Sequence, residues 1–349
     1  MNLLNETIKK IKGVDREIME KCKNRVDNLI KPVGSLGKLE DIVIKLAGIT
    51  GDMYPKVDNK SVIVMAADHG VCEEGIAAAP KEVTLMQAIN MTKGLTGVCA
   101  MAKQAKSDVV VVDIGIDGEI NNDKIINKKI KHGTENITKG PAMTRKEAIT
   151  SIETGILVAT EEIKKGKNIL TTGEMGIGNT TPSAAIVSAI TGMDPKEVTW
   201  VGANLPMDKL KNKINCVKRA IEVNKPIKED TIDVLSKVGG LEIGGMAGVM
   251  LACAANRVPI VIDGFICTVA ALIAYGIEPK VKEYLIPSHS SEEKGAKYAS
   301  EILGLKPMLD MNMRLGEGSG GVLAFNIIEA ATYMNNEMIT FKEAGIGVV

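Results

Sequence analysis

The sequence has few aromatic residues, no net charge and no long apolar run, and each shortage excludes a class of protein. Aromatic residues make up 3% of the 349 positions, and 43 Lys and Arg are balanced by 43 Asp and Glu. A nucleic-acid-binding protein normally has a basic face or aromatic stacking platforms, so we expect no nucleic-acid partner. The longest apolar segments, residues 244–255 and 264–276, are too short to span a bilayer, so no membrane insertion is expected.

Residues that pair into disulfides or bind metals are also scarce. The six cysteines form no C-x-x-C pair, and the three histidines have no H-x-x-x-H spacing, so we predict reduced thiols and no metal site. The first residues alternate charged and apolar side chains at helical spacing without the apolar core of a signal peptide. These features predict a cytoplasmic protein.

Short apolar, β-branched runs recur along the chain with room for helices between them. Continuous rather than alternating apolar runs indicate strands that are buried on both faces of a parallel sheet. The expected strands are residues 61–68, 107–116, 168–173, 198–203, 258–265 and 281–287. Helical periodicity in residues 144–166, 208–221 and 246–257 completes the βα alternation of a doubly wound α/β fold. Residues 1–32 and 321–349 look helical without strands, which predicts a small helical domain beside a large α/β domain of residues 33–320.

One glycine-rich turn, "GEMGIGNTTP" at residues 173–182, follows an expected strand. Gly176 and Gly178 allow successive backbone N–H groups to face a ligand, and Pro182 suits the first turn of a helix that Thr180 or Thr181 would cap. A helix N-terminus favours an anion. The glycine order G-x-x-G-x-G is not that of a dinucleotide fingerprint, and no Walker lysine follows, so one phosphate fits better than a triphosphate or NAD. A plain capped turn remains the alternative.

A second turn, "MRLGEGSGG" at residues 313–321, places Glu317 between two glycines ahead of an apolar helix. The glycines allow close approach of a ligand to the carboxylate, whereas the structural alternative is an acid that complements the helix dipole. Taken alone, Lys213 on an expected helix is more often a solvated lysine than a phosphate ligand.

Ten stretches in order resemble the nicotinate-nucleotide:dimethylbenzimidazole phosphoribosyltransferase family across nearly the whole chain. They are "LIKPVGSLGKLEDI" (29–42), "MAADHGV" (65–71), "PKEVT" (80–84), "GPAMTRKEA" (140–148), "GEMGIGNTTPSAAI" (173–186), "VGANLP" (201–206), "VGGLEIGGMAGVML" (238–251), "DGFICTVAAL" (263–272), "SHSSEEKGA" (288–296) and "MRLGEGSGG" (313–321). The resemblance implies a Rossmann-like sheet of six parallel strands with helices on both faces, plus a small helical bundle built from both chain ends.

The resemblance also implies a reaction. The family transfers 5-phosphoribose from nicotinate mononucleotide to a benzimidazole nitrogen, releasing nicotinate and inverting C1′, with no cofactor or metal. It implies Glu317 as the general base and Glu174 as a carboxylate that orients the acceptor or stabilises charge on ribose. The implied nucleotide-binding and phosphate-binding residues are Gly176, Gly178, Asn179, Thr180, Gly202, Ala203, Lys213, Ser290 and Ser291. The implied acceptor pocket contains Ala79, Pro80, Gln87, Met175 and Leu315.

The acceptor and the oligomer are left open by the same resemblance. Ala79 and Met175 stand where some family members have serine and leucine, so another azole, adenine or a phenol is an alternative acceptor, the last giving an O-glycosidic product. Members are dimers with active sites near the subunit interface, and the partner is an identical or a paralogous chain. Two rival hypotheses are a non-catalytic subunit of the same fold and a nicotinamide-dependent dehydrogenase.

Overall fold

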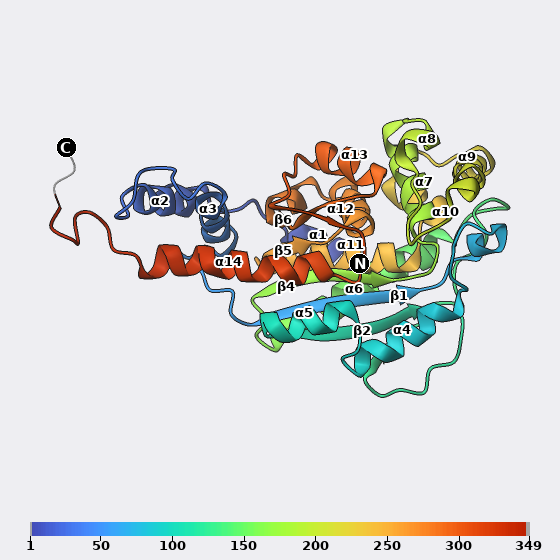
Figure 1. Cartoon of the computed structure of the whole chain (residues 1–349), viewed down its shortest axis with the longest axis horizontal. Helices are drawn as coiled ribbons and strands as arrows, with labels where there is room; N and C mark the ends of the chain where they lie inside the picture. The colour runs from blue at the N-terminus through green and yellow to red at the C-terminus, as the bar shows by residue number, and fades with distance from the viewer. Residues whose placement is uncertain (1, 347–349) are drawn as a thin grey trace.

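A parallel sheet runs through the centre of the computed structural model, which describes residues 2–346 (Figure 1). Its strands are β1 (Lys60–Ala67), β2 (Ser107–Gly115), β3 (Ile125–Asn127), β4 (Ile169–Met175), β5 (Ile260–Ile262) and β6 (Leu285–Pro287). They lie in the order β3-β2-β1-β4-β5-β6, and every neighbouring pair is parallel. The expected six-stranded parallel sheet is confirmed. A separate two-stranded parallel sheet joins β7 (His289–Ser291) and β8 (Leu309–Met313).

The six strands are not the six expected ones. The expected strand at 198–203 is wrong, because Val198 ends a short helix and both Gly202 and Asn204 have φ of +61°, which breaks extended backbone. The sixth strand of the sheet is instead β3, a three-residue edge strand that is too short to leave a signal in the sequence. The expected strand at 281–287 is shortened, because its first half forms the 3₁₀-helix η3 (Pro279–Tyr284).

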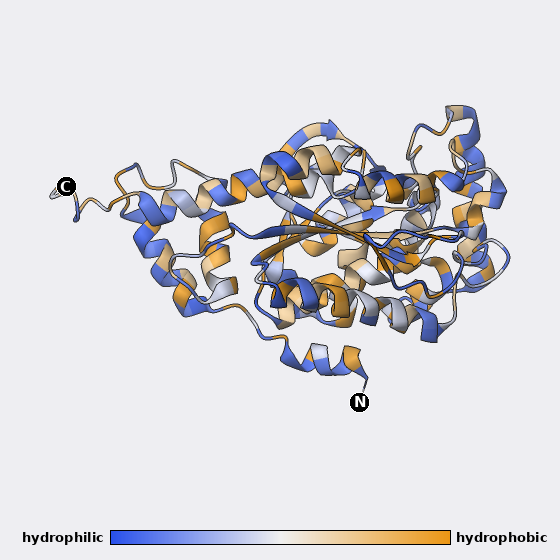
Figure 2. Ribbon diagram, turned by 90° about the horizontal axis from the view of Figure 1, so that it is seen from below, coloured by the Kyte–Doolittle hydropathy of each residue, from blue (hydrophilic) through white to orange (hydrophobic). Residues whose placement is uncertain are grey.

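Helices cover both faces of the sheet, which separates two apolar cores (Figure 2). One core contains residues of α1 (Leu3–Lys10), α6 (Arg145–Lys164), α7 (Thr180–Thr191), α8 (Pro195–Val198), α9 (Leu210–Asn224), α10 (Thr231–Val238), α11 (Leu241–Ala255), α12 (Phe265–Ile277) and α13 (Lys294–Leu303). The other contains residues of α2 (Arg16–Asp27), α3 (Lys38–Thr50), α4 (Glu82–Thr92), α5 (Gly97–Ala105) and α14 (Ser319–Glu337). Two more 3₁₀-helices are η1 (Gly70–Glu74) and η2 (Met207–Lys209). No helix within residues 2–346 combines the length and the apolar character needed to cross a membrane.

Strand β1 shows why its sequence is apolar without alternation. Ile63, Met65 and Ala67 belong to one core, and Val62, Val64 and Ala66 belong to the other. Successive side chains of a strand point to opposite faces, so a strand covered on both sides is apolar at every position. The expected helix at 144–166 is confirmed as α6, which begins with a capping box formed by Thr144 and Glu147.

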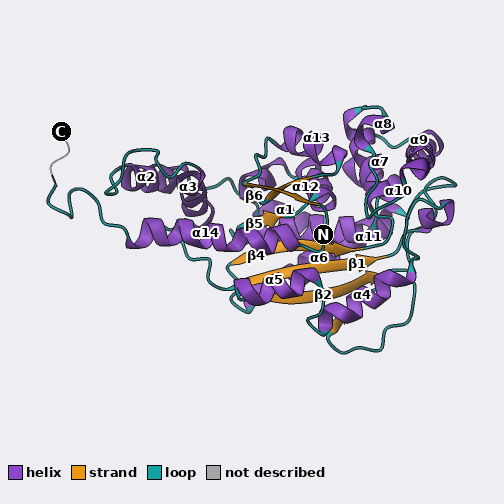
Figure 3. Ribbon diagram, in the orientation of Figure 1, coloured by secondary structure: helices purple, strands orange, loops and turns teal. Residues whose placement is uncertain are grey.

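Helices α2 and α3, near the start of the chain, lie beside the second half of α14, near its other end, at one end of the molecule (Figures 1 and 3). Arg25 donates to the backbone carbonyls of Asn335 and Met338, at 3.2 and 3.0 Å. Helix α1, in contrast, packs against α6 and α11 on the α/β part, where the N–H of Leu4 donates to Glu153 at 3.0 Å. Residues 1 and 347–349 of the expected helical domain lie outside the described residues.

Candidate active site

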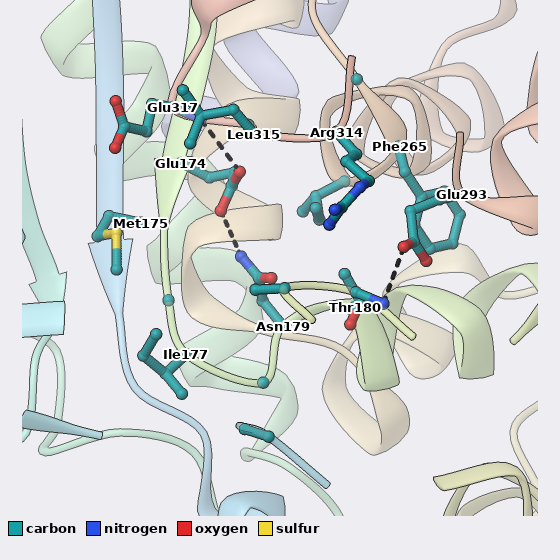
Figure 4. A pocket seen from close by; sticks show the side chains of 18 of the residues that line it. Glu174, Met175, Ile177, Asn179, Thr180, Phe265, Glu293, Arg314, Leu315 and Glu317 are labelled. Carbon is teal, nitrogen blue, oxygen red and sulfur yellow. Dashed lines mark hydrogen bonds between the residues drawn. The ribbon is translucent and has the colours of Figure 1, made fainter. Parts of the chain in front are cut away.

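A cavity of about 280 Å³ opens at the carboxyl ends of β1 and β4, where the direction of strand order reverses. In doubly wound sheets the carboxyl ends of the strands at this reversal form the usual ligand crevice. The cavity is lined by residues 76–79, 83, 87, 174–180, 201–203, 213, 263–267, 289, 291, 293 and 314–317. The close-up in Figure 4 shows Glu174, Glu317 and Leu315 on one side, Thr180, Phe265 and Glu293 on the other, and Arg314 between them.

The structure brings nearly all of the sequence-predicted site residues into this lining. Those present are Glu174, Met175, Gly176, Gly178, Asn179, Thr180, Gly202, Ala203, Lys213, Ser291, Ala79, Gln87, Leu315 and Glu317. Pro80 and Ser290 are not among the lining residues, and both are exposed. Ser290 is the middle residue of β7, so its side chain points away from the face that carries His289 and Ser291 into the cavity.

Glu174 is the penultimate residue of β4 and is almost fully buried. Its Oε2 accepts a hydrogen bond from the amide of Asn179, and its Oε1 accepts the backbone N–H of Glu317 at 3.4 Å. Burial, together with the nearby carboxylates of Asp263 and Glu242, raises the pKa of Glu174 to about 8 against the hydrogen bond from Asn179. At neutral pH this carboxyl group therefore carries a proton for most of the time.

Glu317 is held in a left-handed backbone conformation, with φ of +63°, that non-glycine residues seldom adopt. Its carboxylate reaches the start of α5, where Oε2 accepts the N–H of Val98 at 3.0 Å. Burial raises the pKa of Glu317, and the donors at the start of α5, Val98 and Thr96, pull it back down. The sequence suggested that Glu317 complements the helix that follows it, whereas the helix end that it contacts is that of α5.

Asp263 follows β5 and occupies the amino end of α14. Its Oδ1 accepts the N–H groups of Gly320 and Gly321, at 2.7 and 3.1 Å, and its Oδ2 accepts that of Gly318 at 3.0 Å. Residues 316–321 have the spacing G-x-G-x-x-G, which in dinucleotide-binding proteins presents such N–H groups to a pyrophosphate. Here a side chain of the protein already accepts them, so the turn does not function as a dinucleotide cradle.

The opposite end of the cavity has the features of an anion site. Lys213 is buried, and its Nζ donates to Thr180 Oγ1 at 2.7 Å. Burial lowers the pKa of Lys213 to about 8, although the carboxylate of Glu293 favours the charged amine. Glu293 in turn accepts the N–H of Gly202 at 2.9 Å.

Helix α7 points its amino end at this part of the cavity, with a different start from the one expected. The helix begins at Thr180 with Asn179 as its cap residue, two residues before the expected start at Pro182, and neither Thr180 nor Thr181 caps it. Asn179 does not cap the helix with its side chain either, because that side chain donates to Glu174. No side chain caps the helix, so its dipole still favours an anion there, although the N–H groups of Thr181 and Ser183 already donate to the carbonyls of Gly178 and Asn179.

Sequence reasoning missed five polar or aromatic lining residues, which are Asp263, Phe265, His289, Glu293 and Arg314. All lie in turns that the sequence marked as strand ends or glycine-rich, but nothing in the sequence distinguished them from their neighbours. Arg314 lines the cavity, and its charge counteracts the raised pKa of Glu293. The same residues contain no group of three or more His, Cys, Asp or Glu side chains placed to hold a metal ion.

Comparison with known proteins gives consistent matches over the whole chain. A family model described as a phosphoribosyltransferase matches residues 11–346. A nicotinate-nucleotide–dimethylbenzimidazole phosphoribosyltransferase of Alkaliphilus metalliredigens (strain QYMF) is 57% identical over 349 residues, covering 100% of both chains. One of the same name from Clostridioides difficile (strain 630) is 52% identical, covering 99% of this chain and 100% of its own. The crystal structure of the enzyme so named from Thermus thermophilus superimposes with a TM-score of 0.91 at 37% identity, covering 96% of this chain and 100% of that one.

Proposed function

This chain belongs to the phosphoribosyltransferase family, and we propose that it transfers 5-phosphoribose from nicotinate mononucleotide to 5,6-dimethylbenzimidazole. The products are nicotinate and the α-ribazole-type 5′-phosphate used in cobamide assembly. The observation that carries the proposal is the two-ended cavity. Two buried carboxyl groups, Glu174 and Glu317, lie at one end, and Lys213 lies at the other with the amino end of α7, which no side chain caps.

The chemistry needs one base and no strong acid. The bond between C1′ and the pyridinium nitrogen breaks, and its electron pair returns to that nitrogen, so nicotinate leaves without needing a proton. The lone pair of one benzimidazole nitrogen forms the new bond from the opposite face of C1′, and the proton on the other nitrogen must be removed. Glu317 is the proposed acceptor of that proton, since its raised pKa makes it a better base than an exposed glutamate.

Glu174 is proposed to orient rather than to deprotonate. With a pKa of about 8 it is mainly neutral at pH 7, and its oxygens already hold Asn179 and the backbone of Glu317. A neutral carboxyl group can also donate a hydrogen bond to the acceptor or the ribose. Ala79, Met175 and Leu315 supply apolar surface near these acids for a flat aromatic acceptor.

The anion end is proposed to take the nucleotide. Nicotinate mononucleotide has two anionic groups, the 5′-phosphate and the nicotinate carboxylate, and the cavity has two cations, Lys213 and Arg314. Lys213, Gly176 and Gly178 suit the phosphate, because a helix end and an ammonium group lie together there. Gly202 and Ala203 are proposed to line the nicotinate, with Ser291 as a further phosphate ligand.

The test is nicotinate release from nicotinate mononucleotide by the purified chain, with dimethylbenzimidazole, adenine and phenol in separate reactions and product masses measured. Release with dimethylbenzimidazole and a product of the ribazole phosphate mass supports the proposal. Release only with phenol would replace the acceptor by a phenolic one and the product by an O-glycoside. No release with any acceptor, from a chain that binds the nucleotide, would overturn the proposal for the chain alone and favour a non-catalytic subunit.

The assembly and the location are further proposals. We propose a homodimer, with a heterodimer of this chain and a paralogue as the alternative that sedimentation of the purified chain would test. We also propose a cytoplasmic location, in keeping with six cysteines that are all unpaired.

A further inference from the structure

The turn that carries Glu317 has an unfavourable backbone conformation and one internal hydrogen bond, from the N–H of Ser319 to the carbonyl of Gly316 at 3.0 Å. Glu317 and its two glycine neighbours have consecutive positive φ angles of +84°, +63° and +93°. Left-handed backbone is unfavourable for a residue with a Cβ, and glycine gives a chain more freedom than other residues. A turn of this composition needs external contacts to keep one conformation.

Two carboxyl groups from neighbouring strands supply those contacts. Glu174, on β4, accepts the N–H of Glu317 at 3.4 Å. Asp263, at the end of β5, accepts the next available N–H groups, those of Gly318, Gly320 and Gly321, at 3.0, 2.7 and 3.1 Å. Asp263 thus holds most of the backbone donors between the base and the first turn of α14.

The turn is also pressed against its surroundings. A Cβ added to Gly173 would lie 2.1 Å from the carbonyl oxygen of Glu317, and one added to Gly320 would lie 2.0 Å from His289 Nδ1. His289 Nδ1 is itself 3.8 Å from Asp263 Oδ1 and 3.0 Å from Ser288 Oγ. The backbone therefore has no room to slide towards the sheet, and Asp263 fixes it in the remaining direction.

We propose that Asp263 is a positioning residue for the phosphoribosyl transfer, holding the turn at residues 316–321 so that the Glu317 carboxylate faces the acceptor, and acting on Glu317 through its negative charge. This inference rests on the proposed function. Asp263 does not take part in proton transfer, because three backbone donors already bind its two oxygens.

The charge of Asp263 gives a signature that a purely structural role lacks. The titratable or charged groups that line the cavity with Glu317 are Glu174 from β4, Lys213 from α9, Asp263 after β5, His289 from β7, Glu293 before α13 and Arg314 after β8. Burial is the main cause that raises the pKa of Glu317, and the charge of Asp263 raises it further. Removing that charge lowers the pKa of Glu317, so the acid limb of the kcat profile moves to lower pH.

Asp263→Asn is the sharpest substitution. An asparagine keeps the size and one acceptor oxygen, but its NH2 group faces the N–H of Gly318 or of Gly320 and Gly321, where two donors cannot bond. Asp113→Asn is the matched control. Asp113 is a buried aspartate at the end of β2 that accepts the N–H of Ile116 at 2.8 Å and lies near Lys129, but it does not line the cavity.

The experiment measures kcat, the KM for nicotinate mononucleotide and the pH profile of kcat for the wild-type chain and both variants. For Asp263→Asn we expect kcat to fall by about 10- to 100-fold, as misplacement of a catalytic group does, with KM changed by less than about twofold. We also expect its acid limb to move to lower pH, and neither change in Asp113→Asn. An unchanged kcat, an acid limb that does not move, or equal losses in both variants would overturn the proposal.

A second readout does not depend on turnover. Hydrogen exchange of the peptide that covers residues 316–322 should become faster in Asp263→Asn and stay unchanged in Asp113→Asn, whatever the acceptor. If the wild-type chain showed no turnover, the proposed function would fail. The exchange measurement would still test whether Asp263 holds the turn at residues 316–321. If Asp263→Asn did not fold, the smaller and neutral Asp263→Ser takes its place with the same expected results, and unchanged exchange in it would overturn the proposal.

Discussion

The two glutamates of the cavity lie close together, with the backbone N–H of Glu317 3.4 Å from Glu174 Oε1, yet their carboxyl groups have different hydrogen-bond partners. Glu174 belongs to a central strand, and its bonds are to a side-chain amide and to one weakly placed backbone N–H. Glu317 belongs to a strained turn, and its carboxylate is bound by the N–H of Val98 at the start of α5. The first has its pKa raised to about 8, and in the second the donors at a helix start counteract the same burial.

This difference teaches how one cavity can hold an acid and a base side by side. Burial raises the pKa of both groups, and it is opposed at Glu317 by the donors at the start of α5 and at Glu174 by the amide of Asn179. Two carboxyl groups with environments that separate their pKa values are a recurring arrangement for acid and base roles. Glu317, which is bound at a helix start, is the proposed base, and Glu174, with a pKa of about 8, is the proposed neutral partner.

The largest effect is expected for Glu317→Gln. Glutamine keeps the shape and can still accept the N–H of Val98, but it cannot take a proton, so kcat should fall by about 10²- to 10⁴-fold. The KM for nicotinate mononucleotide should change little. Initial rates of nicotinate release measure both parameters. Glu337→Gln, on the exposed end of α14, is the control and should match the wild type.

Near-normal turnover of Glu317→Gln would contradict the roles proposed for Glu317 and Glu174, because Glu317 would then not be the base. The pH profile gives a further check of the same assignment. Since the pKa of Glu317 is raised and only its ionised form accepts a proton, wild-type kcat should decline as pH falls, starting above the usual range of glutamate.

Next in size is the effect of Lys213→Ala, which tests the other end of the cavity. Loss of a charge-assisted hydrogen bond to phosphate should raise the KM for the nucleotide by about 10- to 100-fold with kcat nearly unchanged. In the wild type, the buried amine loses its proton as pH rises through about 8, so this KM should be constant at lower pH and should increase above it.

Lys211→Ala is the matched control for Lys213→Ala, since Lys211 is an exposed lysine of the same helix, α9. Steady-state kinetics measured between about pH 6 and pH 9, in steps of roughly half a pH unit, would resolve the rise in the KM for the nucleotide that is expected for a pKa of about 8. A variant of Lys213 that lost turnover but kept its KM would show that the lysine acts in the chemical step rather than on the phosphate.

A smaller effect is expected for Glu174→Gln, the substitution that tests the comparison most directly. Because Glu174 is mainly neutral at pH 7, a neutral glutamine preserves its charge state, and Asn179 can rotate its amide to meet the new NH2 group. We expect a loss in kcat of about tenfold, equivalent to one weakened hydrogen bond. A loss as large as that of Glu317→Gln, measured in the same assay, would show that Glu174 acts as an ionised group.

The parts of the fold that sequence could predict are those with a local signal. Strands β1 and β2 contain continuous apolar runs, at residues 62–67 and 109–112, because helices cover both of their faces, and this pattern is visible in the sequence. Strand β3 has three residues, and its pairing with β2 depends on tertiary structure. Residues 198–203 look like a strand, but backbone turns at Gly202 and Asn204 prevent one.

The same division holds in the cavity. Glu174 and Glu317 could be chosen because each stands beside glycines and matches a family motif, and Glu174 also follows an expected strand. Asp263 could not, since its function is to bind N–H groups more than fifty positions away in the sequence. The sequence could not separate Ser290 from Ser291. Their side chains point in opposite directions because they alternate along β7, and a strand of three residues leaves no pattern in the sequence.

The smallest effect is expected next to Glu174, at Met175, which also lines the cavity and is 9% exposed. Met175 and Leu315 present apolar surface on the side of the cavity that holds the two glutamates, and Met175→Leu nearly conserves volume while removing the flexible thioether. We expect the KM for dimethylbenzimidazole to change by less than about threefold, with kcat and the KM for the nucleotide unchanged. The informative quantity is the ratio of kcat/KM between dimethylbenzimidazole and adenine, because a stiffer side chain adapts less well to an acceptor of different shape. A shift in this ratio at constant kcat would show that Met175 contributes to the choice of acceptor without affecting the chemical step. A change in kcat instead would mean that the substitution at residue 175 disturbs the neighbouring Glu174. The apolar surface that contacts the acceptor and the two glutamates would then not act independently.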